Sequence, residues 1–295
     1  MELENALYYY GIQAKLPYSL LKGVAEAGDL TRQPLDVWRR SQVARRMRRN
    51  SKWRGFMPRE KGYAIFDKSS MPGVERVVAV CRKLVEERRD NGPKRREKNP
   101  FTFYERPEDF ENNPELLDFA LSDPIIETVS DYLGFLPQLK SIGLWLTQPL
   151  PKDLFGSQLM HLDQPEVGIV GVFINVSDVR PENGPFSFLP ADLSRRVNDA
   201  VNYPKRYYCD DGRVTDEEVF SVCRPEDVKS LVGPAGTGGF VDLSACQHYG
   251  SRCSSGERII FAIKFQKAHK ARHEVRPFFR RYQDKVEQPR SLVIT

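Results

Sequence analysis

The first half of the chain carries apolar residues at helical spacing. Over residues 74–85 they alternate in helical steps with charged residues, which predicts an amphipathic helix. A second helix is expected over residues 114–120. A third should follow directly, with Asp123 as its cap, Pro124 at its first position and Gly134 at its end.

From about Leu139 onward the pattern changes to short apolar runs separated by turns rich in glycine and proline, such as residues 181–184. The candidate strands, with one earlier run included, are residues 62–66, 139–147, 168–176, 186–189, 239–243 and 258–265. Many short strands with such turns favour a mainly β fold with flanking helices. The specific prediction is a double-stranded β-helix, that is, a cupin-like jelly-roll core.

These patterns suggest how the chain is divided. Residues 1–60 are expected to form a helical, basic N-terminal extension, and residues 61–295 the jelly-roll domain. Within that domain, the polar residues 202–232 are interpreted as an insertion with a helix at 215–222.

Composition narrows the class of protein. A hydrophobic fraction of 40% and an aromatic fraction of 11% suit a packed globular core. No apolar run approaches the roughly 20 residues that a membrane span needs, and the acidic start with Glu2 and Glu4 does not resemble a secretory signal. The five cysteines include no CxxC pair, which favours free thiols and a cytoplasmic location.

The net charge of +5 is unevenly spread, because basic residues heavily outnumber acidic ones between residues 32 and 61. Such a run can bind phosphates or an acidic partner. No recognised nucleic-acid motif accompanies it, so a solvated helix face is the preferred interpretation and a nucleic-acid partner is not expected. Binding of DNA or RNA through this run remains the alternative from a different functional class.

The four histidines are the most informative residues for chemistry. His161 and Asp163 stand two apart, so on an extended strand both side chains project from one face. His248 lies far downstream, and a jelly roll brings distant strands face to face. Two histidines and one carboxylate can hold iron(II) and leave coordination positions open for a bidentate 2-oxo acid and for O2. The plainer alternative is that these are ordinary core or surface histidines.

A bound 2-oxo diacid also needs a cation for its distal carboxylate. Arg258 stands ten residues after His248, at the head of an apolar strand, and its guanidinium can point inward. Its neighbour Arg252 is the rival for this role.

Four short motifs occur in a consistent order. They are the strand at 62–66, His161-Leu-Asp163, the segment 173–190 with its Glu182-Asn-Gly184 turn, and residues 238–251 leading to Arg258. Over residues 62–265 the chain therefore resembles the phytanoyl-CoA dioxygenase family of 2-oxoglutarate oxygenases.

The resemblance implies roles for individual residues. His161, Asp163 and His248 would bind iron, and Arg258 would hold 2-oxoglutarate with help from Ser251. Phe173 falls where the family often has an aromatic residue lining the cosubstrate site, and Gln148 is a weaker candidate for a polar contact.

The chain departs from the family pattern in three places. Met160 replaces an aromatic residue, Tyr249 stands as an insertion after the distal histidine, and Arg258 is one place closer to that histidine than usual. The second departure puts the role of Ser251 in doubt, and the third keeps Arg252 as a rival.

The resemblance also implies a reaction. Iron(II), 2-oxoglutarate and O2 would hydroxylate a C–H bond of a small organic substrate, with an anionic compound as one option, and release succinate and CO2. Desaturation or ring formation would use the same ligands. Two further alternatives are a zinc or cupin-like enzyme that does not use 2-oxoglutarate, and an inactive family member that serves as an interaction module.

Overall fold

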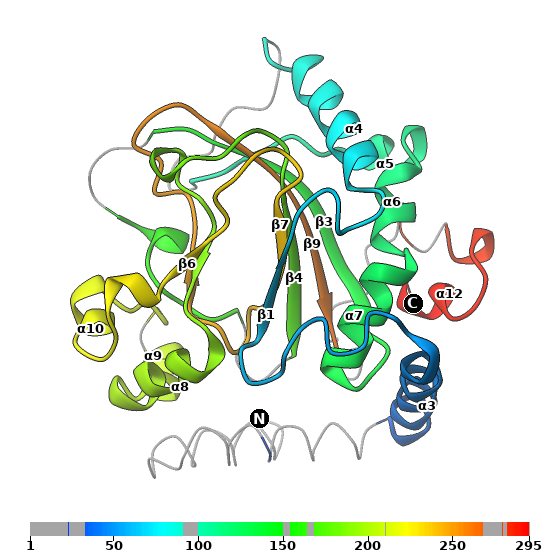
Figure 1. Ribbon diagram of the computed structural model, residues 1–295, viewed down its shortest axis with the longest axis horizontal. Helices are drawn as coiled ribbons and strands as arrows, with labels where there is room; N and C mark the ends of the chain where they lie inside the picture. Colours follow the sequence, from blue (N-terminus) through cyan, green and yellow to red (C-terminus); the bar gives the residue numbers. More distant parts are fainter. Residues whose placement is uncertain are drawn as a thin grey trace.

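A computed structural model describes residues 33–90, 100–149, 154–163, 168–209, 211–267, 279 and 282–294, together with Gly23. Its centre is an antiparallel six-stranded sheet in the order β1-β7-β4-β9-β3-β2 (Figure 1). The strands are β1 (Tyr63–Phe66), β2 (Thr102–Phe103), β3 (Gln138–Thr147), β4 (Ile169–Asn175), β7 (Gly238–Asp242) and β9 (Arg258–Gln266).

A smaller antiparallel sheet has the order β6-β5-β8 and packs against one face of the larger sheet. Its strands are β5 (Ser187–Phe188), β6 (Lys229–Ser230) and β8 (His248–Tyr249). Two facing antiparallel sheets form the expected jelly-roll core with flanking helices.

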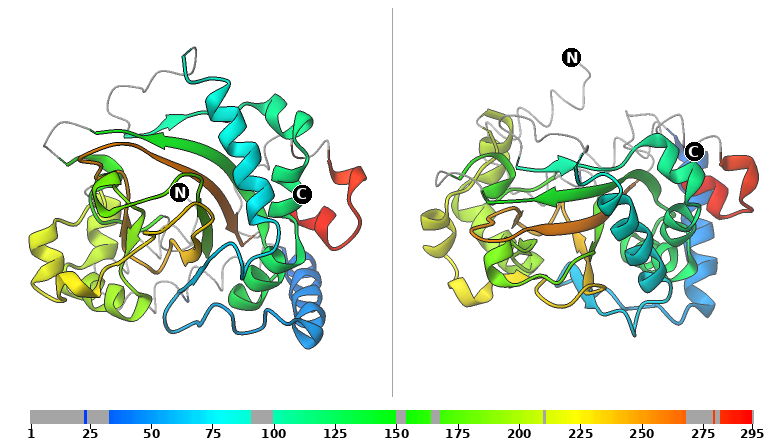
Figure 2. Two further views of the ribbon diagram at one scale, coloured as in Figure 1. Left: turned by 45° about the horizontal axis from the view of Figure 1, so that its top comes forward. Right: turned by 90° about the horizontal axis from the view of Figure 1, so that it is seen from above.

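Helices cover the outer side of the larger sheet and the far side of the smaller one (Figures 1 and 2). The first group is α3 (Pro34–Asn50), α4 (Val74–Glu86), α5 (Pro107–Asn112), α6 (Glu115–Ala120), α7 (Asp123–Leu133) and α12 (Arg290–Val293). The second group is α8 (Ala191–Ala200), α9 (Tyr203–Cys209) and α10 (Asp216–Phe220). Short 3-10 turns lie at Gly156–Gln158, Pro181–Asn183, Pro225–Asp227 and Gln283–Lys285. No helix in the described ranges is long and apolar enough to cross a membrane.

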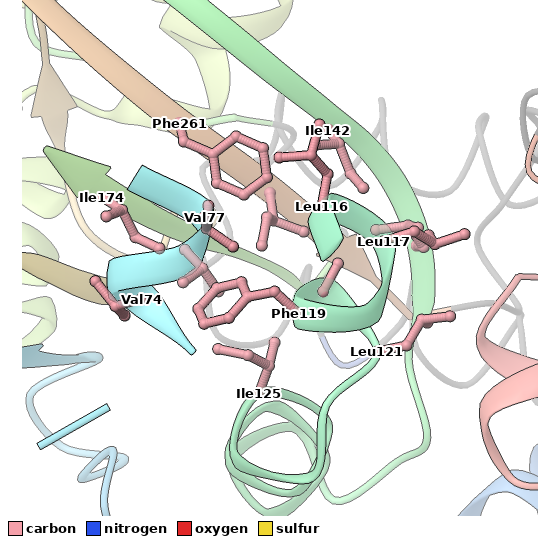
Figure 3. Close-up of a cluster of buried hydrophobic side chains, with 14 of the residues drawn as sticks. Val74, Val77, Leu116, Leu117, Phe119, Leu121, Ile125, Ile142, Ile174 and Phe261 are labelled. Atoms are coloured by element: carbon pink, nitrogen blue, oxygen red, sulfur yellow. The ribbon is translucent and has the colours of Figure 1, made fainter. Parts of the chain in front are cut away.

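The alternation of side chains along the central strands separates the core from the site. In β9, Phe261 and its odd-numbered neighbours join the large core beneath the helices, whereas Ile260 and Ala262 face the smaller sheet. Figure 3 shows Phe261 beside Ile142 and side chains from α4 and α6. The same alternation in β4 turns Phe173 toward the smaller sheet. The interior between the two sheets is therefore lined by one side of each central strand.

Most expected elements occur within one or two residues of their predicted ends. Helix α7 differs at its start, because Ser122 rather than Asp123 is the residue before the first turn. The Ser122 hydroxyl donates to the Phe119 carbonyl instead of capping the helix. Gly134 does end α7 in the left-handed conformation, at φ 67°. Within residues 215–222, α10 matches the expected helix and begins with a true capping box from Thr215 to Glu218.

Several elements were not predicted from the sequence. They are β2, β6, β8, α5, α8, α9 and α12. The three strands have only two residues each, which is too short for an alternating pattern to be recognised. The described cysteine side chains, Cys81, Cys223, Cys246 and Cys253, are free thiols as expected.

Helix α3 packs against α7, on the helical side of the larger sheet (Figure 1). Arg40 is buried there, and its guanidinium donates to Asp36 Oδ2 at 2.9 Å and to the Leu292 carbonyl at 2.8 Å. Arg48 pairs with Asp131 at 2.6 Å. Part of the basic run thus anchors α3 to the body of the fold. Whether residues 1–60 form a separate extension stays a prediction, because most of residues 1–32 lie outside the described chain.

Candidate active site

Backbone pairing brings the HxD segment against the distal histidine. His161 and His248 exchange two main-chain hydrogen bonds, of 3.1 and 3.0 Å, so their side chains lie on the same face. Asp163 donates its backbone N–H to the Leu243 carbonyl at 2.8 Å, just beyond β7. The turn after β7 is itself fixed by Asp242, whose carboxylate accepts from Ser244. Segments eighty or more residues apart therefore meet through main-chain bonds.

The three side chains form a compact group of ligand atoms. Asp163 Oδ1 lies 3.8 Å from Nε2 of His161 and 3.8 Å from Nε2 of His248. All three ligand atoms lie within 4.8 Å of one another. The Nδ1 atoms of His161 and His248 contact the carbonyls of Leu159 at 2.8 Å and Cys246 at 3.0 Å. A carbonyl can only accept, so each Nδ1 carries the proton and each Nε2 lone pair faces the group.

The electrostatics of this group favour metal binding. Burial lowers the pKa of His161 and His248 below 6.5, and each ring is therefore neutral near pH 7. Burial opposes ionisation of Asp163, but the charge and hydrogen bond of Lys264 outweigh it and hold the pKa of that carboxyl well below its usual range. Two neutral imidazoles and one carboxylate are a suitable donor set for a divalent transition metal.

Lys264 is the cation beside this group. Its Nζ lies 2.5 Å from Asp163 Oδ2, the oxygen that does not face the imidazoles. It is also 5.9 Å from the centre of the Trp145 ring. Sequence reasoning missed Lys264, although a signal was present: Arg258, Ile260 and Lys264 are separated by even steps on one strand and so share a face.

A cavity of about 240 Å³ opens from the ligand atoms into the space between the sheets. Four aromatic side chains lie in its wall, and two of them, Phe173 and Phe186, stack with ring centres 4.0 Å apart. The residues that line it include Phe101, Trp145, Ser157, Phe173, Phe186, Gly250, Arg258, Ile260 and Lys264. Gly143 leaves room for the Trp145 indole, because a Cβ there would lie only 2.2 Å from the indole nitrogen. The cavity therefore joins the ligand atoms to a largely apolar chamber.

Arg258 lies in the wall of this cavity, and only 1% of its surface is exposed. Its Nη2 donates to Thr147 Oγ1 at 3.2 Å, while Nε and Nη1 have no hydrogen-bond partner in the described part of the chain. Burial lowers the pKa of Arg258 to about 10, which still leaves it charged at neutral pH. A buried guanidinium with two unmatched donors is costly without an anion.

Arg252 is arranged differently. Both of its terminal nitrogens pair with the Asp216 carboxylate at 2.8 Å, and its Nε donates to the Gln158 carbonyl at 2.7 Å. Its guanidinium also stacks 3.6 Å from the centre of the Tyr249 ring. Arg252 therefore ties α10 to the loop after β8 and does not line the cavity, whereas Arg258 does.

Of the remaining predicted residues, one lines the cavity and two do not. Phe173 lines the cavity, as described. Ser251 is fully buried at a left-handed φ of 68°, and its hydroxyl lacks a partner, but Gly250 rather than Ser251 lines the cavity. Gln148 is exposed just beyond β3 and lines no cavity at this site.

A second cavity, of about 280 Å³, adjoins the first. The two share His161, Asp163 and Arg213. Its other lining residues are Lys140, Leu162, Tyr207, Asp211 and Gly212. Sequence reasoning also missed Arg213. No motif marked it, because residues 211–214 reach the site only through tertiary pairing.

No protein-family model and no curated protein matches the chain. Among solved structures, EctD from S. alaskensis with bound Fe has a TM-score of 0.50 and 15% identity, over 70% of this chain and 73% of that chain. The non-heme alpha ketoglutarate dependent carbocyclase SnoK from nogalamycin biosynthesis has a TM-score of 0.47 and 17% identity, over 75% and 86%. HygX from Streptomyces hygroscopicus, with nickel and 2-oxoglutarate bound, has a TM-score of 0.48 and 14% identity, over 74% and 87%. The similarity to EctD shows a shared fold.

Proposed function

We propose that the protein is an iron(II)- and 2-oxoglutarate-dependent dioxygenase that hydroxylates an unactivated C–H bond of a small organic metabolite or natural-product intermediate. One observation carries the proposal. A single cavity has two imidazoles and a carboxylate in its wall and a buried, under-bonded arginine in the same wall. A metal at the first group and a diacid reaching the second would satisfy both.

The residues fit iron(II). His161, Asp163 and His248 would hold it through two Nε2 atoms and one carboxylate oxygen, with the other ring nitrogens fixed by backbone carbonyls. Lys264 orients the carboxylate by holding its second oxygen. The iron bound in EctD, which shares the fold, agrees with this choice of metal.

The residues also fit 2-oxoglutarate. Arg258 would pair with its distal carboxylate, which would supply acceptors for the unmatched Nε and Nη1 donors. Phe173 and Phe186 would pack along the carbon chain and exclude water. Ser251 assists only if its hydroxyl turns toward the cavity, and Gln148 is the weakest candidate because it is exposed. Bound iron and 2-oxoglutarate would supply oxidative decarboxylation with O2, giving succinate, CO2 and attack on the substrate C–H bond.

The order of the motifs supports a relationship to the phytanoyl-CoA dioxygenases within the wider group of 2-oxoglutarate oxygenases. Asp163 is present, which argues against the related halogenases, where that carboxylate is missing. The second candidate, a zinc or cupin-like enzyme without 2-oxoglutarate, would leave Arg258 buried and unpaired. That observation favours the 2-oxoglutarate enzyme.

The proposal is tested by measuring succinate formed from 2-oxoglutarate in the presence of iron(II), O2 and a panel of small organic compounds. Wild-type protein should form succinate slowly alone and faster with a substrate. Asp163→Ala should reduce both rates to background, because a ligand is lost. Equal rates in wild type and Asp163→Ala would refute the assignment of the metal site.

A further inference from the structure

Arg213 is a cation that the proposed reaction leaves unused. It lies in the wall of both cavities, beside His161 and Asp163. No hydrogen bond or ion pair of its guanidinium is present in the described part of the chain, and Nη1 is buried without a partner. A buried donor without an acceptor carries a desolvation cost that a bound anion would relieve.

The insertion at 202–232 places Arg213 there by main-chain pairing. Val214 and Met160 form an antiparallel bridge, and Val214 donates to the Met160 carbonyl at 2.9 Å. One step along each segment, Arg213 stands opposite His161, so the two side chains share a face. Val214 and Met160 point the other way, into a buried cluster.

Tyr203 secures this arrangement. Its hydroxyl accepts from the Leu162 backbone N–H at 2.7 Å and donates to the Gly212 carbonyl at 3.0 Å. One buried side chain thus links the HxD segment to the residue before Arg213. The position of Arg213 over the site is therefore built into the fold.

The charges around the site also favour a bound anion. This step rests on the proposed function. Iron(II) with Asp163 keeps one positive formal charge, and together with Arg258 it balances the 2-oxoglutarate dianion. Lys140, Lys264 and Arg213 then add three positive charges to the walls of the two cavities, against one negative charge from Asp211. Excess positive charge in a partly enclosed site favours a negatively charged ligand.

We propose that Arg213 binds an oxyanion, a carboxylate or a phosphate, of the organic substrate in the second cavity. The guanidinium fork matches either group. Binding there would place the rest of the substrate toward the ligand atoms shared by the two cavities. The insertion then supplies the specificity of the enzyme for anionic substrates.

The test uses full-length protein loaded with nickel(II) and 2-oxoglutarate, so that the metal and Arg258 sites are filled without turnover. Benzoate, phenyl phosphate and neutral benzamide serve as probes, observed by ligand NMR. Faster relaxation of a probe with nickel(II) than with diamagnetic zinc(II) places it near the metal. Arg213→Gln is compared with Arg224→Gln, which removes an exposed arginine of the same insertion.

Wild type and Arg224→Gln should bind one anionic probe near the metal, and Arg213→Gln should bind it about tenfold more weakly or worse. Benzamide should not bind. Tighter binding of benzoate would indicate a carboxylate site, and tighter binding of phenyl phosphate would indicate a phosphate site. Equal affinity in wild type and Arg213→Gln, or no binding of either anion to wild type, would overturn the proposal. So would loss of 2-oxoglutarate binding in Arg213→Gln, because Arg213 would then belong to the cosubstrate site.

Failure of the proposed function would look different. Wild type would then not take up nickel(II) and 2-oxoglutarate at all. In that event the same probes are titrated into metal-free Arg258→Met protein, in which Arg213 is the remaining guanidinium in the described cavity walls. Binding that disappears in the added Arg213→Gln variant supports the anion site independently, and binding that persists rejects it.

Discussion

Lys264 Nζ lies 2.5 Å from Asp163 Oδ2, and the other oxygen of the same carboxylate faces both imidazoles at 3.8 Å. One oxygen is thus committed to the ammonium and the other is left for a metal. The arrangement favours a carboxylate that binds metal through a single oxygen. A cation outside the group of His161, Asp163 and His248 therefore holds the orientation of its carboxylate.

Replacing Lys264 with methionine should raise the pKa of Asp163 in the metal-free protein. Burial, which opposes ionisation of this carboxyl, would then no longer be offset by the ammonium. The measurement is a pH titration of the ¹³C-labelled aspartate carboxyl by NMR. Lys264→Arg, which keeps the charge, should retain the low pKa. An Asp163 that titrates alike in wild type and Lys264→Met would show that Lys264 does not control it.

Arg258→Met should weaken 2-oxoglutarate binding by about 2 kcal/mol or more, roughly thirtyfold in Kd. Its guanidinium is the one that lines the cavity with unmatched donors. Arg252→Met is the matched control. It should leave this Kd nearly unchanged and lower stability by about 1 kcal/mol, through loss of the Asp216 pair. Isothermal titration gives the affinity, and the reverse pattern would transfer the cosubstrate role to Arg252.

The metal-free protein should lose stability as the pH falls below about 6.5. Between the lowered native pKa of His161 and His248 and the ordinary value of 6.5, the unfolded chain binds protons that the native rings do not. The free energy of unfolding therefore decreases with falling pH, by about 1.4 kcal/mol per pH unit for each histidine. Asp163 has a depressed pKa, so its contribution is lost only at more acidic pH.

Urea unfolding between about pH 7.5 and about pH 5.5 measures this slope. His248→Gln cannot gain the proton and should show a shallower slope than wild type. Identical slopes in the two proteins would mean that His248 is not held neutral by burial.

Arg40→Ala should lower the free energy of unfolding by about 2 kcal/mol, because it removes buried hydrogen bonds to Asp36 and the Leu292 carbonyl. It should not change 2-oxoglutarate affinity, since α3 packs on the helical side of the larger sheet. Arg45→Ala, an exposed position on the same helix, should change stability by less than about 0.5 kcal/mol. A large loss of cosubstrate affinity in Arg40→Ala would instead support a role for the basic run at the site.

The residues that the local sequence pattern marked as metal ligands lie together in the structure, and Arg258 lies in the wall of the same cavity; their roles stay predictions. The spacing of two residues places His161 and Asp163 on one face of an extended strand. Arg258 stands at the head of an apolar strand, so its side chain can point into the interior. Pattern alone could not separate Arg258 from Arg252. That distinction depends on Asp216, which lies 36 residues before Arg252 and pairs with its guanidinium. Arg258 has no such carboxylate partner in the described part of the chain.

Arg213 shows the limit of sequence reasoning at this site. It lies in a polar segment with no motif, and its position follows from the Met160–Val214 bridge and the Tyr203 hydroxyl. Such contacts join segments that are distant in sequence, and no periodicity within either segment reports them. Lys264 is the opposite case, because the even spacing from Arg258 was present in the sequence and went unused.

The most direct measurement is an anaerobic titration of the metal-free protein with iron(II) and then 2-oxoglutarate, followed by visible absorption. Chelation of iron(II) by the 2-oxo acid should produce a metal-to-ligand charge-transfer band in wild type, and His161→Ala should lack it. Iron binding without the band in wild type would contradict the 2-oxoglutarate assignment. Binding of neither component would contradict the metal site itself.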